Sequence, residues 1–176
     1  MGAQSKVSFA GVRQRIPAAT ARALNRSIGS AKTALARRIA QETGLKVGSV
    51  NARLRISKAS EERLSARIYA SVKGVPLALF RPKGRYPSRG KGTGVSASIG
   101  GRSVSHPHAF IAKVGTKKLR GVFEREGKAR GPLDTVFGPS IADLSEKHTA
   151  NALARGQEQV VKNLQSEFRF ALSRTA

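Results

Sequence analysis

The sequence predicts an α+β fold: a long N-terminal helix, a central antiparallel sheet or small open barrel, and a long C-terminal helix. Apolar residues recur at helical spacing near each end of the chain and at alternate positions between glycine-rich turns in the middle. The length of 176 residues predicts a single domain over 1–176. Within it we expect a helical part at 16–54, a β part at 63–126 with a basic loop at 81–92, and a C-terminal helix at 139–173.

The first helix is expected to run from Pro17 to Thr43. Proline suits the first turn of a helix, since its missing N–H group is not needed there, and Gly44 is a typical stop signal. Apolar residues at spacings of three and four form one stripe along this helix. They are Ala21, Leu24, Ile28, Ala31, Leu35 and Ile39. A short second helix, at 46–54, follows the turn.

The spacing of apolar residues changes from helical to alternating after residue 63. Short strands between glycine-rich turns are typical of an antiparallel sheet. Pro76 indicates a sheet edge or a bulge. The predicted strands lie at 64–72, 75–80, 95–99, 109–114 and 119–124.

A second long helix is expected after Pro139. Ser140 can cap its first turn, and Asp143 stands three residues later in the position of a capping box. The helix has an apolar face, although Gly156 can bend or break it. The residues of that face are Ile141, Leu144, Leu153, Val160, Val161, Leu164, Phe168 and Leu172.

Positive charge is concentrated in the first two thirds of the chain. The whole chain has 33 Lys and Arg against 10 Asp and Glu, a formal net charge of +23. Residues 1–123 carry 25 basic and 3 acidic residues, whereas residues 124–176 carry 8 and 7. Such a field favours a polyanionic partner or an acidic protein neighbour.

Several kinds of chemistry are excluded or unsupported. The chain has no cysteine, which excludes disulfides, thiolate metal sites and cysteine nucleophiles. No apolar stretch approaches the roughly 18 residues of a transmembrane helix, so no membrane partner is expected. His106 and His108 lack a third ligand for zinc and fit a loop before a strand better. We predict a protein that is not an enzyme, with no catalytic residues, metal or cofactor.

The segment 39–55 has features of a helix-turn-helix unit. Gly44 lies at its turn, and the apolar spacing around it is that of a DNA-reading motif. The preceding helix is much longer than such a unit requires. A glycine-capped helix that turns a corner explains the same residues. A sequence-specific DNA-binding protein that uses 39–55 therefore stays an alternative function, as does a ribosome- or nucleoid-associated basic protein.

The basic loop at 81–92 is the best candidate for binding. Its cations stand among glycines and prolines with one aromatic, Tyr86, which suits contact with phosphates rather than stacking on bases. An acidic surface on a neighbouring subunit would suit them equally. The residues assigned to DNA or to a neighbouring ring are Arg81, Lys83, Arg85, Arg89 and Lys91.

Short motifs along the chain occur in the same order as in a known family. They are Ala23-Leu24-Asn25-Arg26, Ala31-Lys32-Thr33, Glu42-Thr43-Gly44-Leu45, Val50, Arg53-Leu54-Arg55, Leu64-Ser65-Ala66, Pro76-Leu77, Ala109-Phe110-Ile111-Ala112, Gly121-Val122-Phe123 and Phe137-Gly138-Pro139-Ser140. Through these motifs, residues 16–144 resemble the minor tail protein Z family of tailed bacteriophages and prophages.

The resemblance implies a virion structural protein, a tail-completion or neck component at the junction of head and tail, with no catalytic residues to carry over. We expect a homo-oligomeric ring, a hexamer, that lines or abuts the DNA path. Its partners would be further copies of itself, other phage neck and tail proteins, and genomic double-stranded DNA contacted through the backbone. It would reside in the tail or neck of the virion after assembly in the cytoplasm of the bacterial host.

Contacts with subunits or neighbours are assigned to apolar residues of the first helix and of a later turn. They are Leu24, Ile28, Leu35, Ile39, Phe137 and Pro139. The turn at 137–140 is also expected to position the last helix.

Overall fold

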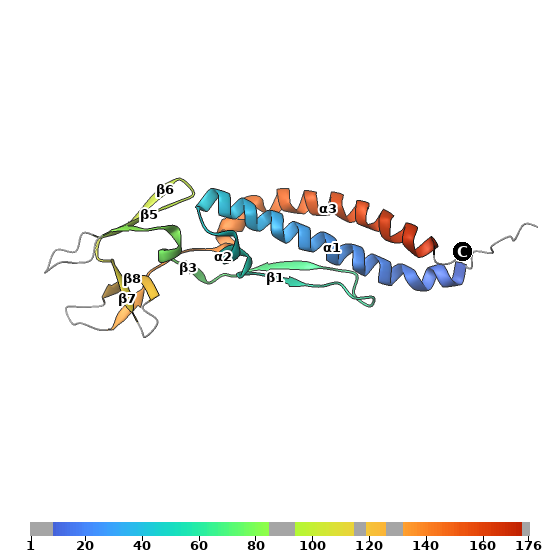
Figure 1. The fold of residues 1–176 in the computed structure, drawn as a ribbon, viewed down its shortest axis with the longest axis horizontal. Helices are drawn as coiled ribbons and strands as arrows, with labels where there is room; N and C mark the ends of the chain where they lie inside the picture. The colour runs from blue at the N-terminus through green and yellow to red at the C-terminus, as the bar shows by residue number, and fades with distance from the viewer. Residues whose placement is uncertain (1–8, 85–93, 115–118, 126–131, 174–176) are drawn as a thin grey trace, which may run out of the picture. The chain divides into compact units, whose positions relative to one another are not determined.

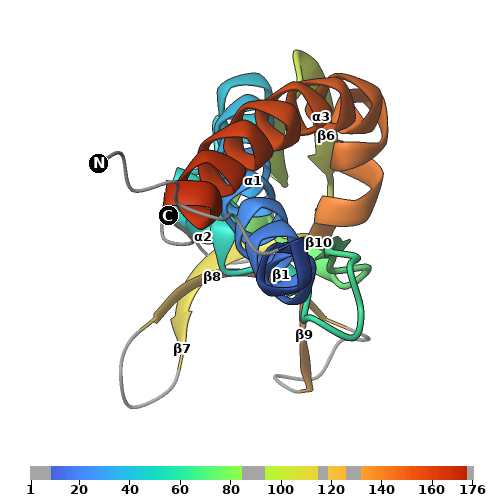
Figure 2. The ribbon, with the colours of Figure 1, turned by 90° about the vertical axis from the view of Figure 1, so that its right-hand side faces the viewer.

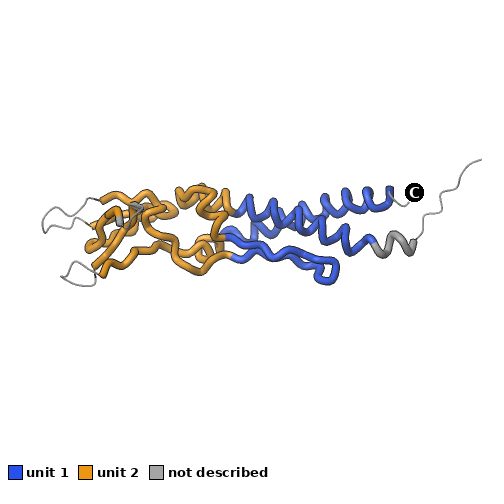
Figure 3. The backbone as a smooth tube through the Cα atoms, turned by 60° about the horizontal axis from the view of Figure 1, so that its bottom comes forward, with its two compact units in different colours: residues 1–35, 54–69, 147–176 blue, residues 36–53, 70–146 orange. Residues whose placement is uncertain are grey.

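The computed structural model describes residues 9–84, 94–114, 119–125 and 132–173 (Figure 1). The chain forms two compact units, coloured separately in Figure 3. Unit 1 comprises residues 1–35, 54–69 and 147–176, and unit 2 comprises residues 36–53 and 70–146. The predicted α+β class is confirmed, with a long helix near each end of the chain and antiparallel strands between them. The single-domain organisation stays a prediction.

The first helix, α1 (Phe9–Thr43), begins earlier than predicted. Pro17 lies inside it rather than in its first turn. A proline within a helix removes one backbone hydrogen bond, and here the helix continues on its N-terminal side despite that loss. The predicted end is correct: Gly44 takes the left-handed conformation at φ +74° and donates its N–H to the Ala40 carbonyl over 2.9 Å.

The helix predicted at 46–54 is shorter in the structure, because Leu54 belongs to the strand that follows. Helix α2 (Val47–Asn51) has five residues, and β1 (Leu54–Ser57) pairs with β2 (Arg67–Ala70). The alternating strand predicted at 64–72 is reduced to β2. Leu64 and Val72, at its predicted ends, are 46% and 81% exposed.

In unit 1, a double hydrogen bond ties α1 to the segment between β1 and β2. Asn25 donates from Nδ2 to the Ala59 carbonyl over 2.9 Å, and its Oδ1 accepts the Ala59 N–H over 2.8 Å. Ala59 itself is buried. The amide thus satisfies both backbone groups of one buried residue, which holds that segment on the helix.

The final helix, α3 (Ile141–Ser173), runs antiparallel to α1 in unit 1, and Figures 1 and 2 show the two helices side by side. Ser27 of α1 contacts Asn163, while Arg22, earlier in α1, contacts Glu167, later in α3. The helix is continuous through Gly156, so of the two effects expected of this glycine, a bend or a break, the break does not occur. A Cβ at Gly156 would lie 3.7 Å from the Cβ of Ala31, so the glycine stands where the two helices approach.

The buried side of α3 in unit 1 differs from the predicted apolar face. Leu153, Val161 and Leu172 were expected on that face, yet they are 61%, 55% and 49% exposed. The buried residues of this part of α3 are His148, Asn163, Glu167 and Ala171. Small residues line the facing part of α1, and the polar groups that pack there are satisfied by hydrogen bonds. Of the other predicted residues, Ile141 is buried and Leu144, Val160, Leu164 and Phe168 are half-buried, so apolar spacing identified only part of the buried side.

Unit 2 contains the strands from β3 to β10, whereas the β1–β2 pair lies in unit 1 apart from Ala70. Instead of one sheet, the strands of unit 2 form three small ones: β10–β3, β4–β5–β6 and β7–β8–β9. The elements are β3 (Gly74–Pro76), the 3-10 helix η1 (Leu77–Phe80), β4 (Lys83–Gly84), β5 (Val95–Ile99), β6 (Arg102–His106), β7 (Phe110–Val114), β8 (Leu119–Arg125), β9 (Leu133–Thr135) and β10 (Phe137–Ser140). The large apolar side chains of unit 2 that are almost completely buried are Ile39, Val50, Val75, Leu77, Val95, Val122 and Ile141.

Two predicted elements of unit 2 change type. The strand expected at 75–80 ends at Pro76, and η1 follows with Leu77 and Phe80 both buried, a three-residue spacing that fits a 3-10 turn. The turn expected at 137–140 is strand β10, because it pairs with β3. The close approach requires glycine: a Cβ at Gly74 would lie 2.9 Å from the Gly138 carbonyl oxygen.

Strands β6, β9 and β10 were not predicted, and neither was β4, which falls in the predicted basic loop at 81–92. Each is short or polar, and β6 is exposed along nearly its whole length, so it has no alternation of apolar residues to detect. His106, predicted in a loop, is the last residue of β6. Strands β5, β7 and β8 agree with their predicted positions to within a residue or two.

The predicted capping box is present at the start of α3. Ser140 donates its N–H and its hydroxyl to Asp143 Oδ2 over 3.0 and 2.8 Å, and Asp143 donates its N–H to Ser140 Oγ over 3.1 Å. The hydrogen bond from the Ser140 hydroxyl, then that from its N–H, holds the pKa of Asp143 below its ordinary value. The first turn of α3 is therefore stabilised by an ionised carboxylate.

Candidate functional site

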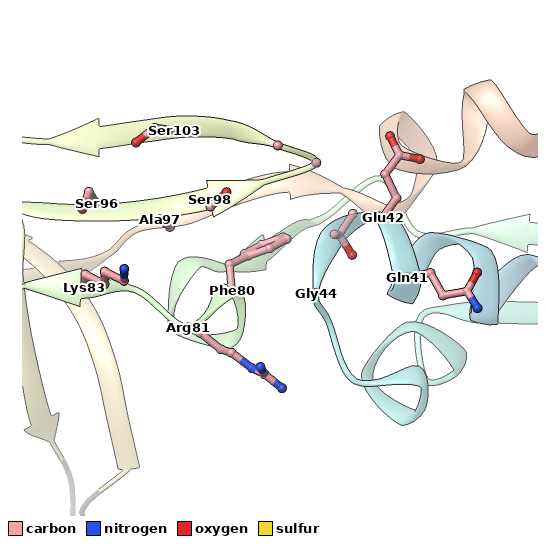
Figure 4. Close-up of a pocket in the computed structure, with 13 residues that line it drawn as sticks. Gln41, Glu42, Gly44, Phe80, Arg81, Lys83, Ser96, Ala97, Ser98 and Ser103 are labelled. Atoms are coloured by element: carbon pink, nitrogen blue, oxygen red, sulfur yellow. The ribbon is translucent and has the colours of Figure 1, made fainter.

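An open pocket in unit 2 brings together residues from three parts of the chain. It lies where α1 ends, beside η1 and the β4–β5–β6 sheet, and has a volume of about 540 Å³ (Figure 4). Its lining residues are Gln41, Glu42, Thr43, Gly44, Phe80, Arg81, Lys83, Ser96, Ala97, Ser98, Gly100, Gly101 and Ser103. Polar and small residues predominate, so the pocket suits a hydrated, polar partner rather than an apolar ligand.

Two of the five basic loop residues predicted to bind line this pocket. Arg81 follows η1, Lys83 begins β4, and both are exposed. Arg85, Arg89 and Lys91 lie outside the described residues. The structure thus places the first two cations of the predicted set beside a hydroxyl-rich sheet. Their binding role stays a prediction.

Arg81 has an unusual backbone conformation. Its φ is +52°, and it is the one non-glycine residue with positive φ in the described part of the chain. A left-handed conformation costs an ordinary residue about 1 kcal/mol or more, and such costs cluster at functional sites. Glycine would be less strained than arginine at this position. The presence of a cation there makes Arg81 a candidate functional residue.

An acidic residue stands at the opposite end of the pocket. Glu42, near the end of α1, approaches the turn between β5 and β6: a Cβ at Gly100 would lie 3.7 Å from its Oε1. Figure 4 shows Glu42 on the helix side and Lys83 on the sheet side. The pocket therefore has a positive end and a negative end, with serines between them.

The residues predicted to contact subunits or neighbours differ in exposure. Leu35 and Ile39 are buried within the chain, while Leu24, Ile28 and Pro139 are half-buried. Phe137 is 55% exposed, which leaves it the most accessible of the set. Their contacts with other subunits stay predictions.

Exposed apolar residues of α3 were missed as candidates for such contacts. Leu153, Val161, Phe170 and Leu172 are each about half exposed or more. The apolar spacing of α3 did place three of them, Leu153, Val161 and Leu172, on its apolar face, but none of the four was named as a contact residue. Only the packing of α1 against the other side of α3 shows that these residues are accessible.

The helix-turn-helix alternative has poor geometry. The second helix of such a unit must lie in the major groove, and α2 has only five residues before β1 begins. The segment 39–55 is a glycine-capped helix that turns a corner.

His106 and His108 do not form a metal cluster in the part of the chain that the structure describes. Groups of three or more His, Cys, Asp or Glu that could hold a metal ion are absent there. Nor does a helix within the described ranges have the length and apolar character to cross a lipid bilayer.

A protein family matches the chain over most of its length. The model of a family described as prophage minor tail protein Z (GPZ) matches residues 11–175. The matched range includes the pocket, all three sheets of unit 2 and the whole of α3. Neither a curated protein nor a solved structure matches the chain.

Proposed function

Because the chain belongs to the prophage minor tail protein Z family, we propose that it completes the phage tail as part of the neck, forming a homo-oligomeric ring where the tail joins the head. The family is one of phage minor tail proteins. The observation that carries the proposal is the extent of the match, residues 11–175 of 176. The proposed role is structural, without a catalytic step.

The exposed apolar residues of α3 support the proposed ring. Leu153, Val161 and Leu172 leave apolar area in water, and burying it against a neighbouring subunit is favourable. Identical subunits that contact through such a surface can close into a ring. A hexamer is the proposed stoichiometry, and other neck and tail proteins would lie above and below it.

The net charge supports a position beside the DNA path. A subunit carries a formal charge of +23, and a ring multiplies this field around one axis. Arg81 and Lys83 add exposed cations beside the pocket of unit 2. The proposed ring would therefore line or abut double-stranded DNA through contacts with its backbone. It would be assembled in the host cytoplasm and kept in the virion.

Quantitative mass spectrometry of purified, nuclease-treated phage particles tests the location. The expected result is a few to a dozen copies for each portal. Absence of the protein from complete particles would refute the neck assignment, whatever the purified protein does in solution.

The ring itself is tested in the particle by crosslinking from α3. The chain has no cysteine, so a photoreactive group can be attached to one introduced cysteine, as in Leu153→Cys. We expect covalent adducts between copies of the chain that extend to a hexamer. Ser166→Cys, at an exposed polar position of α3, is the matched control. Adducts only to other proteins from Leu153→Cys would contradict a ring that closes through this surface.

A further inference from the structure

One face of the β4–β5–β6 sheet is lined by hydroxyl groups. Strand register places Lys83 and Ser105 on either side of Ser96, and Ser103 beside Ser98. Directly paired residues share a face of a sheet, and so do residues two apart along a strand. These five residues, hereafter the hydroxyl face, therefore point to one side; Figure 4 shows four of them.

The opposite side of the same sheet is the core side. Val95, Ala97 and Ile99 alternate with the serines of β5 and are 1%, 4% and 8% exposed. Ser98, Ser103 and Ser105 are exposed, and Ser96 is half-buried. The sheet is thus fixed in register by its apolar side, which leaves the hydroxyl face accessible to a partner.

The hydroxyls of this face have no hydrogen-bond partner among the described residues, unlike those of Ser27 and Ser140. Ser27 donates to a helical carbonyl and Ser140 closes the capping box. Serine is also not one of the strong strand formers, and threonine would supply the same hydroxyl with a higher strand propensity. What serine adds is small size, which allows a partner's surface to approach the sheet closely.

The charges around the hydroxyl face favour an anion at one end. Lys83 belongs to the face and Arg81 stands two residues before it, in its strained conformation. Glu42 lies at the other end, beside the Gly100 turn. A polyanion on the face would therefore be attracted at the β4 end and repelled at the turn.

We propose that the hydroxyl face binds the sugar-phosphate backbone of double-stranded DNA without reading its sequence. Serine hydroxyls donate to phosphate oxygens, and Lys83 and Arg81 neutralise phosphate charge. An acidic protein would pair with the cations but would make less use of four hydroxyl donors. The five residues of the face also include no aromatic or apolar side chain of the kind that contributes most to binding in protein interfaces. The inference rests on the proposed function, because the DNA path supplies the ligand.

Fluorescence anisotropy with the full chain and a duplex of about 30 base pairs of arbitrary sequence tests the proposal, between about 50 and 200 mM salt. Replacing all four serines of the face by alanine should weaken binding about tenfold and leave the salt slope unchanged, because no charge is altered. Lys83→Ser should instead reduce the salt slope by about 0.9. Arg102→Ser makes the same change of charge on the other side of β6 and should have a smaller effect on affinity.

The substitution Glu42→Gln should change the affinity for DNA in the opposite direction. If a polyanion lies along the face, removing this carboxylate should strengthen DNA binding, about twofold to fivefold. A merely structural role of Glu42 predicts no gain in affinity. Thermal unfolding of each variant checks that the fold is intact.

Several outcomes would overturn the proposal. One is a wild-type chain that does not bind the duplex at the lowest salt; another is a folded four-serine variant that binds as tightly as wild type. Equal competition by polyglutamate, with no effect of the serine substitutions, would favour an acidic protein instead. Mass spectrometry of phage particles tests the neck assignment independently of DNA binding by this face. The protein can therefore be a neck component even if the hydroxyl face does not bind DNA.

Discussion

Asn163 of α3 donates from Nδ2 to the Ser27 hydroxyl of α1 over 2.8 Å, with Asn163 7% and Ser27 2% exposed. The bond belongs to a chain of hydrogen bonds. Gln159 donates to Asn163 Oδ1 over 3.3 Å, and Ser27 Oγ donates to the Ala23 carbonyl over 2.8 Å. A buried polar pair of this kind contributes little net stability but is costly to break on one side, so it favours one register of the two helices.

Substituting one partner of this pair should therefore destabilise unit 1 more than substituting both. Ser27→Ala leaves the Asn163 amide buried without its acceptor, at an expected cost of about 1–3 kcal/mol in the free energy of unfolding. Adding Asn163→Leu should recover part of that loss. Urea unfolding measures Ser27→Ala, Asn163→Leu and the double variant. The control is Ser30→Ala, since Ser30 makes the same type of bond at an exposed position. Additive losses would contradict the coupling.

Glu167 is a buried carboxylate held by two arginines. Its Oε2 accepts from Arg22 Nε over 2.8 Å, and its Oε1 lies 3.1 Å from Arg26 Nη2. The arginine side chains are 51% and 59% exposed, so solvent screens the pair and lowers its contribution. Glu167→Gln should reduce the free energy of unfolding by about 1 kcal/mol. Glu158→Gln, at an exposed position of α3, should change it by less than about 0.5 kcal/mol. Equal effects in urea unfolding would argue against the pair.

Arg81→Gly should separate stability from binding. Glycine accepts positive φ without a steric cost, so the variant should be more stable than wild type by about 1 kcal/mol. It should also bind duplex DNA with a salt slope smaller by about 0.9, because one cation is lost. Thermal unfolding and anisotropy measure the two effects. A variant that loses stability would show that the arginine side chain is itself structural.

The capping box predicts a specific dependence of stability on pH. Ser140 lowers the pKa of Asp143 in the folded chain, so its contribution is present above the ordinary value of 3.8 and is lost as the pH falls through the lower folded pKa. Asp143→Asn should therefore be less stable than wild type near pH 7, and the two should converge in strongly acidic solution. Unfolding measured at several pH values tests this. A difference that stays constant with pH would assign the effect to lost packing rather than to charge.

The local sequence determined the features that depend on interactions between residues close together in the chain. Gly44 ends α1, because the residue after a helix often needs positive φ. Ser140 and Asp143 form the capping box within four consecutive residues. Strand β5 follows from the alternation of Val95, Ala97 and Ile99. The motifs in order along the chain also identified the family, because they need no knowledge of packing.

The tertiary structure decided the features that depend on contacts between residues far apart in the sequence. Strand β10 forms because β3 is there to pair with it, and β6 is a strand because β5 supplies its hydrogen bonds. The buried side of α3 depends on α1, whose small residues and Ser27 accept polar neighbours such as Asn163. The hydroxyl face likewise needs strand register to bring its serines together with Lys83. The spacing of apolar residues shows which side of a helix or strand is apolar. Whether that side is buried or paired depends on which other parts of the chain pack against it.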